Sequence, residues 1–385
     1  MGNNKYNKGI YAFSGDPITN GHENIVERAS KMFDKLIVAI GVNPDKNYTF
    51  TLEERKDMAR KALEHLPNVG VVSFEGLLVD FAYENKIPTI VRGIRNSKDL
   101  VDELTLFQAG KAQKYDIDTI FLPAEQHLAH ISSSVVKALI KEQGSVEDMV
   151  HLYVKQRLEE KMLNQYVIGI TGGLGVGKSY IGKKFQEIGR KKGVKVYNID
   201  LDSIGHQILS GELTQPRYKE IRGEIIETFG KKVGLPKNKI NRKALGEIVF
   251  NDTAQMKKLN EIMHKPILTR LRKDMHGKKG VILVNAALIA ETDLSYICNN
   301  NVVLISADER VQRDRLMNKN LTVEQIERRV NSQYTTAGKK AHLEGKIEKN
   351  AHCGKLWEIN NSGNLTEKDI EQFFERVVNE VGVKI

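Results

Sequence analysis

The sequence predicts an α/β protein built from two parallel-sheet domains, and three observations support this prediction. Two stretches, starting at Ile10 and at Tyr166, open with a short apolar strand, a glycine-containing turn and a helical pattern. After each opening, apolar strands alternate with helical patterns, as in right-handed α/β sandwiches. The length of 385 residues exceeds what one hydrophobic core usually organises. We therefore expect domains at 1–164 and 165–385.

In the first half, four further strands are expected at Leu36–Val42, Val69–Ser73, Thr89–Val91 and Thr119–Leu122. One helix between them begins after Thr51, because Thr51 and Glu54 form a capping box that satisfies orphan backbone N–H groups. Apolar residues recur at helical spacing from Val146 to Met162. This pattern predicts an amphipathic helix that ends the domain and packs on its own core.

The second half repeats the alternation of strands and helices. After its opening strand, the expected strands are Lys195–Ile199, Val281–Val284, Val302–Ile305 and Trp357–Ile359. Between the first two of these, residues 218–275 read as a continuous helical block.

Composition narrows the partners that the chain is expected to have. The formal net charge is +10, but acidic residues are interleaved with the basic ones throughout. This pattern favours anionic small-molecule substrates over nucleic acid. The two cysteines have no metal-type spacing, so neither a cysteine-ligated metal site nor a disulfide framework is expected. The longest apolar stretch is too short to span a membrane, so we expect a cytoplasmic protein, with a homo-oligomer left open.

A phosphate-binding loop follows the strand that opens the second half. Residues 172–179 fit the pattern G-x-x-x-x-G-K-[ST], between a strand and a helix. The glycines let backbone N–H groups converge on phosphate, Lys178 supplies a positive charge, and the Ser179 hydroxyl is a ligand for Mg²⁺. The residues expected to bind ATP in this way are Gly172, Gly173, Gly175, Gly177, Lys178 and Ser179.

Two carboxylates, Asp200 and Asp202, follow the next strand. Beside a Mg²⁺–phosphate site, one carboxylate suits the metal shell and the other suits a base that accepts the proton of an acceptor hydroxyl. A solvated pair of loop carboxylates is the alternative reading.

A second candidate site lies in the first half, where Asp16-Pro17-Ile18-Thr19-Asn20-Gly21-His22 separates the first strand from the first helix. A histidine at a helix N-terminus can hydrogen-bond a nucleotide phosphate, although a structural histidine is the ordinary reading of a lone Gly-His pair. Other basic and hydroxyl residues are expected at the same rim of the sheet: Lys46, Arg92, Arg95, Ser132, Ser133 and Ser134. With no nucleophile–base pair among them, direct in-line transfer is favoured.

From about Val167 onwards the chain resembles dephospho-CoA kinase. The resemblance rests on the phosphate loop, on Ile199-Asp200-Leu201-Asp202, on Phe229-Gly230, on motifs between Ile240 and His264, and on Gln333 and Asn360-Asn361-Ser362-Gly363. It implies that Asp202 is the base for the ribose 3′-hydroxyl, that Asp200 serves the metal shell, and that residues 218–275 bind the acceptor.

The same resemblance implies that Arg242 contacts acceptor phosphate and that residues 315–319 form a lid over ATP. Three departures stand out. His206 and Lys319 replace arginines, and Asn285-Ala286-Ala287-Leu288-Ile289 replaces an apolar-Pro-Leu-Leu segment. Lysine cannot make the bidentate contacts that arginine offers phosphate.

Residues 8 to about 160 resemble bacterial phosphopantetheine adenylyltransferase. The motifs are the Asp16–His22 segment and, further along, Phe50-Thr51-Leu52-Glu53-Glu54-Arg55, Gly76-Leu77-Leu78-Val79-Asp80-Phe81-Ala82, Val91-Arg92-Gly93-Ile94-Arg95 and Ile131-Ser132-Ser133-Ser134-Val135-Val136-Lys137. The resemblance implies that Ser14, Lys46 and Arg92 hold the phosphate of 4′-phosphopantetheine, and that Leu77 and Leu78 line its pantetheine arm. ATP would be held by His22, Arg95, Glu103 and Ser132–Ser134.

Within this family pattern, Gly-Thr-Phe-Asp-Pro reads Phe13-Ser14-Gly15-Asp16-Pro17 here, so glycine and phenylalanine have exchanged places. Gly110-Lys111 replaces an Asn-Arg pair expected near the adenine side.

Together the two resemblances imply a Rossmann-like nucleotidyltransferase domain followed by a P-loop kinase domain with a helical substrate-binding insertion. The implied function is the last two steps of coenzyme A synthesis, with ATP as co-substrate and Mg²⁺ as cofactor. His22, Lys46, Arg95, Lys178 and Asp202 would be catalytic. Two alternatives stay open at this point: another nucleotidyltransferase joined to an unrelated nucleoside kinase, and a catalytically silent nucleotide-binding scaffold.

Overall fold

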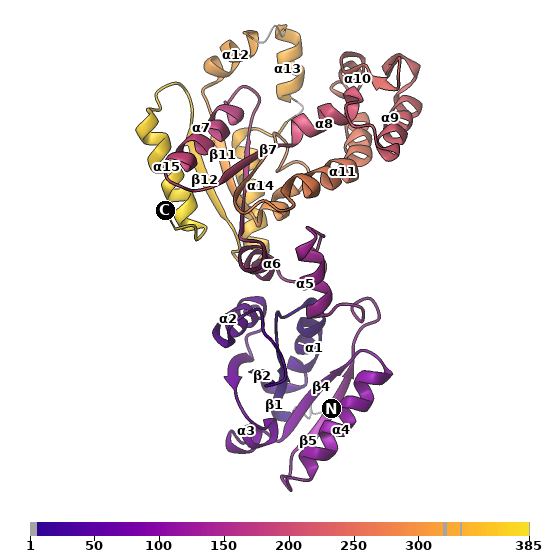
Figure 1. Cartoon of the computed structure of the whole chain (residues 1–385), viewed down its shortest axis with the longest axis vertical. Helices are drawn as coiled ribbons and strands as arrows, with labels where there is room; N and C mark the ends of the chain where they lie inside the picture. Colours follow the sequence, from indigo (N-terminus) through magenta and orange to yellow (C-terminus); the bar gives the residue numbers. More distant parts are fainter. Residues whose placement is uncertain (1–5, 319–321, 332, 385) are drawn as a thin grey trace. The chain divides into compact units, whose positions relative to one another are not determined.

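The computed structural model describes residues 6–318, 322–331 and 333–384, so Lys319 lies outside the described residues. The chain divides into two compact units, Met1–Met162 and Leu163–Ile385, and each is described here by itself (Figure 1). Among the described residues, no helix is both long enough and apolar enough to cross a membrane.

Five parallel strands form the sheet of the first unit. They are β1 (Tyr6–Phe13), β2 (Phe33–Gly41), β3 (Val69–Phe74), β4 (Thr89–Ile94) and β5 (Asp118–Pro123), in the order β3-β2-β1-β4-β5. The strands β2 and β3 lie on one side of β1, and the chain then crosses to place β4 and β5 on the other side. This reversal opens a crevice beyond the carboxyl ends of β1 and β4, where open α/β sheets bind ligands.

Helices cover both faces of this sheet. They are α1 (Asn20–Ser30), α2 (Leu52–Ala62), α3 (Leu78–Glu84), α4 (Ser97–Lys111) and α5 (Ser133–Lys141), followed by α6 (Leu152–Leu158) and the π-helix η1 (Glu159–Leu163). The apolar face of α3 packs Ala82 against Ile10 and Ile90. The expected capping box is confirmed, since Thr51 Oγ1 accepts from the Glu54 N–H at 3.2 Å.

The expected helix over Val146–Met162 is wrong in its first part. Residues 146–151 form turns, and regular α-helix begins only at Leu152. Val146 and Val150 are nevertheless fully buried. In this segment, apolar residues three or four positions apart are buried side chains of an irregular stretch and do not form a helix.

The second unit also has a five-stranded parallel sheet. Its strands are β6 (Gln165–Gly172), β7 (Val196–Asp200), β10 (Gly280–Asn285), β11 (Asn301–Ser306) and β12 (Lys355–Asn360), in the order β12-β11-β6-β10-β7. Alternate residues of the strands face opposite sides. Ile168 and Leu283 pack with α7 (Lys178–Lys191) and α15 (Glu367–Glu380) on one side. Val167 and Ile282 pack with the helices of the other.

The helical block expected at residues 218–275 is corrected by the structure. It contains α9 (Pro216–Phe229), α10 (Arg242–Val249) and α11 (Thr253–Met275), but a small antiparallel hairpin of β8 (Gly234–Leu235) and β9 (Lys239–Ile240) interrupts it. Lys237 and Asn238 have positive φ, which turns the hairpin. The remaining helices are α8 (Leu201–Ser210), α12 (Glu309–Met317), α13 (Val323–Asn331) and α14 (Thr336–Lys349), with short 3₁₀ turns at Lys231–Val233 and Leu294–Cys298.

Candidate active sites

A polar cavity of about 570 Å³ lies beyond the carboxyl ends of β1 and β4 in the first unit. Its walls come from the β1–α1 loop, the end of β4, the start of α4 and the start of α5. The expected site residues that line it are Ser14, His22, Lys46, Arg92, Arg95, Glu103, Ser132, Ser133 and Ser134. The structure therefore brings together residues that are up to 120 positions apart in the sequence.

His22 occupies the third position of α1, and contacts with Thr19 hold its ring in place. The Thr19 N–H donates to His22 Nδ1 at 3.1 Å, and the Thr19 hydroxyl lies 2.8 Å from the same nitrogen. Because Nδ1 accepts, the proton of the neutral ring resides on Nε2. Removal from water, reinforced by the positive charges of Arg95 and Lys46, lowers the pKa of His22 to about 4. The ring is thus a neutral hydrogen-bond donor near pH 7.

Phe13 covers one face of the His22 ring. The two ring centroids are 4.4 Å apart and the planes meet at only 14°. Gly15 has a φ of +61°, and a Cβ at this position would lie 3.2 Å from the Phe13 ring. With phenylalanine at position 13 and glycine at position 15, the turn has a positive φ at Gly15 and an aromatic ring lies against the histidine.

The two arginines of the cavity are held by acidic partners. Arg92 Nε lies 3.2 Å from a Glu103 carboxylate oxygen, and Arg95 Nε donates to Asp99 at 2.7 Å. Lys46 is exposed, and its Nζ lies 3.3 Å from Ser14 Oγ. Burial raises the pKa of Glu103, while Arg92 opposes this effect. These pairs orient the guanidinium groups before any anion enters.

A smaller cavity of about 330 Å³ shares Phe13, Ser14 and Arg92 with the polar one. Its other walls are largely apolar and include Leu77 and Leu78. Gly110 and Lys111 line this smaller cavity and not the larger one, and their expected place near the adenine side stays a prediction. An extended, partly apolar molecule with a phosphate at one end suits these two joined cavities.

Sequence reasoning missed two supports of this site. Arg55 is buried and donates through one nitrogen to the Ser14 carbonyl at 2.5 Å and to the Gly41 carbonyl at 2.8 Å. Asp16 accepts from the Thr49 and Phe50 N–H groups at 3.1 and 3.0 Å, and from Lys137. Both residues lie inside motifs quoted above, but their partners are remote, so local spacing held no signal for them.

The phosphate loop of the second unit is shaped by its glycines. Gly172, Gly175 and Gly177 have φ of +149°, +80° and +96°. A Cβ on Gly172 would lie 2.2 Å from the Ile305 carbonyl oxygen, so only glycine fits there. Lys178 Nζ donates to the carbonyls of Gly172 and Gly173 at 3.0 Å each. Ser179 is exposed at the start of α7, beside the backbone N–H groups of that helix.

Arg315 and Asn361 secure the outer side of this loop. Arg315 donates to the Gly175 carbonyl at 3.3 Å and to the Val176 carbonyl at 3.2 Å. It also donates to the Asn361 carbonyl at 2.8 Å, while Asn361 Nδ2 donates to Val176 at 2.8 Å. In this structure Arg315 therefore binds the loop backbone; the rest of the expected lid includes Lys319, which lies outside the described residues.

The two carboxylates lie at the end of β7. Asp200 caps α8, since its Oδ1 accepts from the Ser203 N–H at 3.0 Å. Asp202 is on the first turn of α8 and lines a cleft beside α11. The protein around Asp202 displaces water and raises its pKa, an effect that Lys178 opposes and Asp200 reinforces. A hydroxyl at Ser179 and a carboxylate at Asp200 are oxygen donors of the kind that Mg²⁺ prefers.

A cavity of about 320 Å³ opens beside Asp202. Its lining is mainly apolar and comes from α11 and from the segment after β10, with Asn260 and His264 among the polar residues. Arg242 and His206 form a pair, with Arg242 Nη2 2.6 Å from His206 Nε2. The histidine that replaces an arginine is thus directly beside the arginine expected to bind acceptor phosphate.

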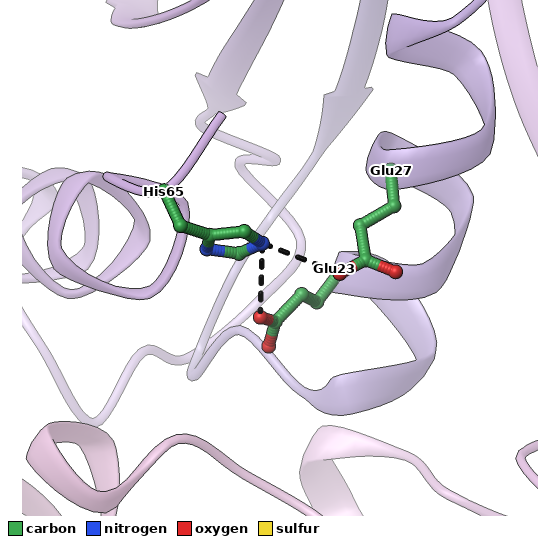
Figure 2. A group of neighbouring side chains, drawn as sticks. All are labelled: Glu23, Glu27 and His65. Atoms are coloured by element: carbon green, nitrogen blue, oxygen red, sulfur yellow. Dashed lines mark hydrogen bonds and ion pairs between the residues drawn. The ribbon is translucent and has the colours of Figure 1, made fainter. Parts of the chain in front are cut away.

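Outside the cavities, Glu23 and Glu27 of α1 face His65 (Figure 2). His65 Nε2 lies 3.2 Å from Glu27 and 3.9 Å from Glu23. Burial raises the pKa of Glu23 to about 7. Partly exposed carboxylates one helical turn apart with a histidine between them form an ordinary ion-pair cluster, and nothing else there points to a bound metal.

A cytidylyltransferase-like family model matches residues 14–139. Phosphopantetheine adenylyltransferase from Nautilia profundicola is 46% identical over 145 residues, which is 38% of this chain and 94% of that protein. The first unit of this chain belongs to the phosphopantetheine adenylyltransferase family. The enzyme of the same name from Actinobacillus pleuropneumoniae serotype 3 is 43% identical over 152 residues, 40% of this chain and 96% of that protein.

The second unit of the chain matches a different family. The dephospho-CoA kinase family model covers residues 166–353. Among solved structures, TT1252 from Thermus thermophilus covers 57% of this chain and 99% of its own length, at 22% identity and a TM-score of 0.40. The chain is therefore a bifunctional transferase that joins a phosphopantetheine adenylyltransferase unit to a dephospho-CoA kinase unit.

Proposed function

We propose that this chain converts 4′-phosphopantetheine into coenzyme A in two ATP-dependent steps. The first unit transfers the adenylyl group of ATP to the phosphate of 4′-phosphopantetheine, giving dephospho-CoA and pyrophosphate. The second unit phosphorylates the ribose 3′-hydroxyl with another ATP. The observation that supports this proposal best is the pair of joined cavities in the first unit, one polar and one apolar, that meet at Ser14 and Arg92.

In the first step, a phosphate oxygen of 4′-phosphopantetheine attacks the α-phosphorus of ATP, and the bond to the β-phosphate oxygen breaks. Ser14, Lys46 and Arg92 hold the attacking phosphate at the junction of the cavities. The His22 Nε2–H group donates a hydrogen bond to the α-phosphate, where negative charge grows in the transition state. A neutral donor is suited to this task, because the ring stays in the same protonation state near pH 7 and its hydrogen bond to the transition state is always available.

Arg95 and the N-terminus of α5, with Ser132, Ser133 and Ser134, bind the remaining phosphates. Glu103 completes the ATP site beside Arg92. No covalent intermediate on the protein is needed, so the rate depends on positioning and on charge stabilisation.

In the second step, the proton of the ribose 3′-hydroxyl passes to Asp202 as the oxygen attacks the γ-phosphorus, and ADP leaves. Lys178 turns from the Gly172 and Gly173 carbonyls to the β- and γ-phosphates. Ser179 and Asp200 would hold Mg²⁺, which would supply positive charge beside the phosphates. Arg242, beside His206, contacts a phosphate of the acceptor.

To test the proposal, the purified full chain is incubated with Mg·ATP and one acceptor at a time. The rate of pyrophosphate release is measured for each acceptor. We expect 4′-phosphopantetheine to be the preferred acceptor over nicotinate mononucleotide and phosphocholine, by a factor of about 10³ or more, since a binding site rejects acceptors that leave its polar groups unpaired. Equal or faster release with another acceptor would overturn the proposal, and normal ATP binding without turnover would favour a silent scaffold.

A further inference from the structure

A buried arginine lies behind the residues proposed to hold the acceptor phosphate, and it has no role in the steps above. Arg55, on α2, is only 1% exposed and lines neither of the two joined cavities of the first unit. Its Nη1 donates to the Ser14 carbonyl at 2.5 Å and to the Gly41 carbonyl at 2.8 Å. Removing a guanidinium group from water is costly, and neutral carbonyls compensate only part of that cost. The position therefore favours a specific task for this side chain.

The two carbonyls that Arg55 bonds stand at the ends of neighbouring strands. Ser14 directly follows β1, Gly41 is the last residue of β2, and the two strands pair in parallel. One nitrogen that bonds both carbonyls fixes the two strand ends relative to each other. Because Ser14 lines the junction of the two cavities, Arg55 thereby sets the place of the Ser14 side chain in the site.

Arg55 also supports the loop that carries Lys46. Its Cζ lies 3.9 Å from the centroid of the Tyr48 ring, which is a cation–π contact. Tyr48 closes the loop, since the Asn43 N–H donates to the Tyr48 hydroxyl at 2.7 Å. Inside the closed loop, the Lys46 N–H donates to the Asn43 carbonyl at 3.1 Å. The Lys46 Nζ then lies 3.3 Å from Ser14 Oγ. One guanidinium group thus contacts the supports of both Ser14 and Lys46.

Two residues proposed to bind ATP are held by other elements. The Thr19 N–H at the start of α1 holds the His22 ring, and Asp99 of α4 holds the Arg95 guanidinium. These supports do not come from α2. A change at Arg55 should therefore act on the binding of the acceptor phosphate much more than on the binding of ATP.

We propose that Arg55 is a positioning residue for adenylyl transfer: it fixes Ser14 and the Lys46 loop relative to each other, so that both meet the phosphate of the acceptor. The inference rests on the proposed adenylyl transfer to 4′-phosphopantetheine. Arg55 does not touch substrate and acts through the Ser14 carbonyl and the Tyr48 ring. Lysine cannot replace it, because an ammonium group can bond the carbonyls but has no planar face to lie on the ring.

The experiment measures pyrophosphate release by the full chain while the concentrations of 4′-phosphopantetheine and of ATP are varied in turn. Arg55→Lys keeps the positive charge and loses the planar face. Tyr48→Leu removes the ring from a half-buried position and leaves the buried arginine in place, whereas Tyr48→Phe keeps the ring and loses the bond to Asn43. Arg60→Lys, at an exposed position of the same helix, is the matched control.

We expect Arg55→Lys and Tyr48→Leu to raise the KM for 4′-phosphopantetheine about tenfold, because small displacements of positioning groups are expensive. The KM for ATP should change less than twofold. Tyr48→Phe should lie between the wild type and Tyr48→Leu, and Arg60→Lys should keep both KM values of the wild type. A merely structural role of Arg55 would instead lower the fraction of active protein, so that kcat falls while both KM values stay the same.

Unchanged kinetics in Arg55→Lys, a fall in kcat alone, or an equal rise of both KM values would overturn the inference. Circular dichroism establishes that each variant is folded, and the kinase rate of the same preparation corrects for the amount of chain. If Arg55→Lys does not fold, Tyr48→Leu decides by the same criteria. The failure of the proposed function is a separate outcome, because the wild-type chain itself would then release no pyrophosphate with 4′-phosphopantetheine.

Discussion

The rings of Phe13 and His22 lie stacked, with centroids 4.4 Å apart and planes inclined by 14°. Together with the Thr19 N–H on Nδ1, this stacking limits the rotation of the imidazole and orients its Nε2 proton. Gly15, where the family pattern has phenylalanine, leaves room for the Phe13 ring. In this chain the Phe13 ring therefore helps to hold the histidine in place.

Replacing Phe13 tests this contact. Phe13→Ala should lower kcat for pyrophosphate release roughly tenfold, since an aromatic pair is worth about 0.5–1.5 kcal/mol and the ring would lose its orientation. Phe13→Tyr keeps the stack and should stay within about twofold of the wild type. The kinase rate of the same preparation is the internal control. Equal rates for Phe13→Ala and the wild type would show that the stack does not orient His22.

The low pKa of His22 leads to a prediction about pH. Because the folded pKa of about 4 lies below the ordinary value of 6.5, His22 is already neutral at pH 6. Adenylyl transfer should therefore show no titration of His22 between pH 6 and 8. His22→Ala should lower the rate about 10²–10³-fold across this range, as loss of a single transition-state donor does. A wild-type limb near pH 6.5 that disappears in His22→Ala would contradict the assigned state of the ring.

Arg315 should control ATP affinity in the kinase unit. Its guanidinium bridges the Gly175, Val176 and Asn361 carbonyls, and lysine cannot reproduce this fork. Arg315→Lys should weaken ATP binding by the kinase unit about tenfold. ATP use by the adenylyltransferase unit should be unchanged. The KM for ATP, measured separately for each half-reaction, tests both expectations. The control is Arg313→Lys on the same helix, for which no such contact with the loop is found in the described part of the chain. Unchanged affinity in Arg315→Lys would mean that Asn361 alone secures the loop.

Glu23 should make the first unit less stable as pH rises. Its folded pKa of about 7 lies above the ordinary value, so the folded state binds more protons than the unfolded state between about pH 4.5 and 7. The sign follows: stability contributed by protonated Glu23 is present at low pH and is lost as pH rises through 7. With 21% of the side chain exposed, we expect Glu23→Gln to stabilise the unit by about 1–2 kcal/mol at pH 8.

Thermal unfolding of the full chain measures this effect. Circular dichroism follows both units, whereas fluorescence of the single tryptophan, Trp357 in the second unit, follows only that one. Glu23→Gln should raise the first-unit transition at pH 8, leave it near the wild-type value at pH 5, and leave the tryptophan transition unmoved at both. A larger gain at pH 5 than at pH 8 would reverse the sign and refute the assignment.

Local patterns in the sequence predicted the strands, the phosphate loop and most residues of the polar cavity, whereas Ser14 and Glu103 were implied only by the family resemblance. They succeeded because parallel sheets place the residues that follow each strand at one edge, so position along the chain determines position at the rim. The turns at residues 146–151 were read as helix because burial of Val146 and Val150 imitates a helical repeat. The β8–β9 hairpin is too short to leave an alternating pattern.

The contacts that support the sites were beyond sequence reasoning. Lys137 reaches Asp16 across 121 positions, and Lys339 reaches Ala287 across 52. Lys339 is buried and Lys137 is half-buried, and nothing in the local sequence distinguishes either of them from the other lysines of α14 and α5. Such pairs become visible only when the fold brings the elements together.

The most direct measurement of the central claim is mass spectrometry of the products formed by the full chain from 4′-phosphopantetheine and Mg·ATP. The wild type should yield coenzyme A, Asp202→Asn should stop at dephospho-CoA, and His22→Ala should form coenzyme A only when dephospho-CoA is added. Coenzyme A from Asp202→Asn at the wild-type rate, or no dephospho-CoA from any variant, would contradict two successive ATP-dependent transfers on one chain.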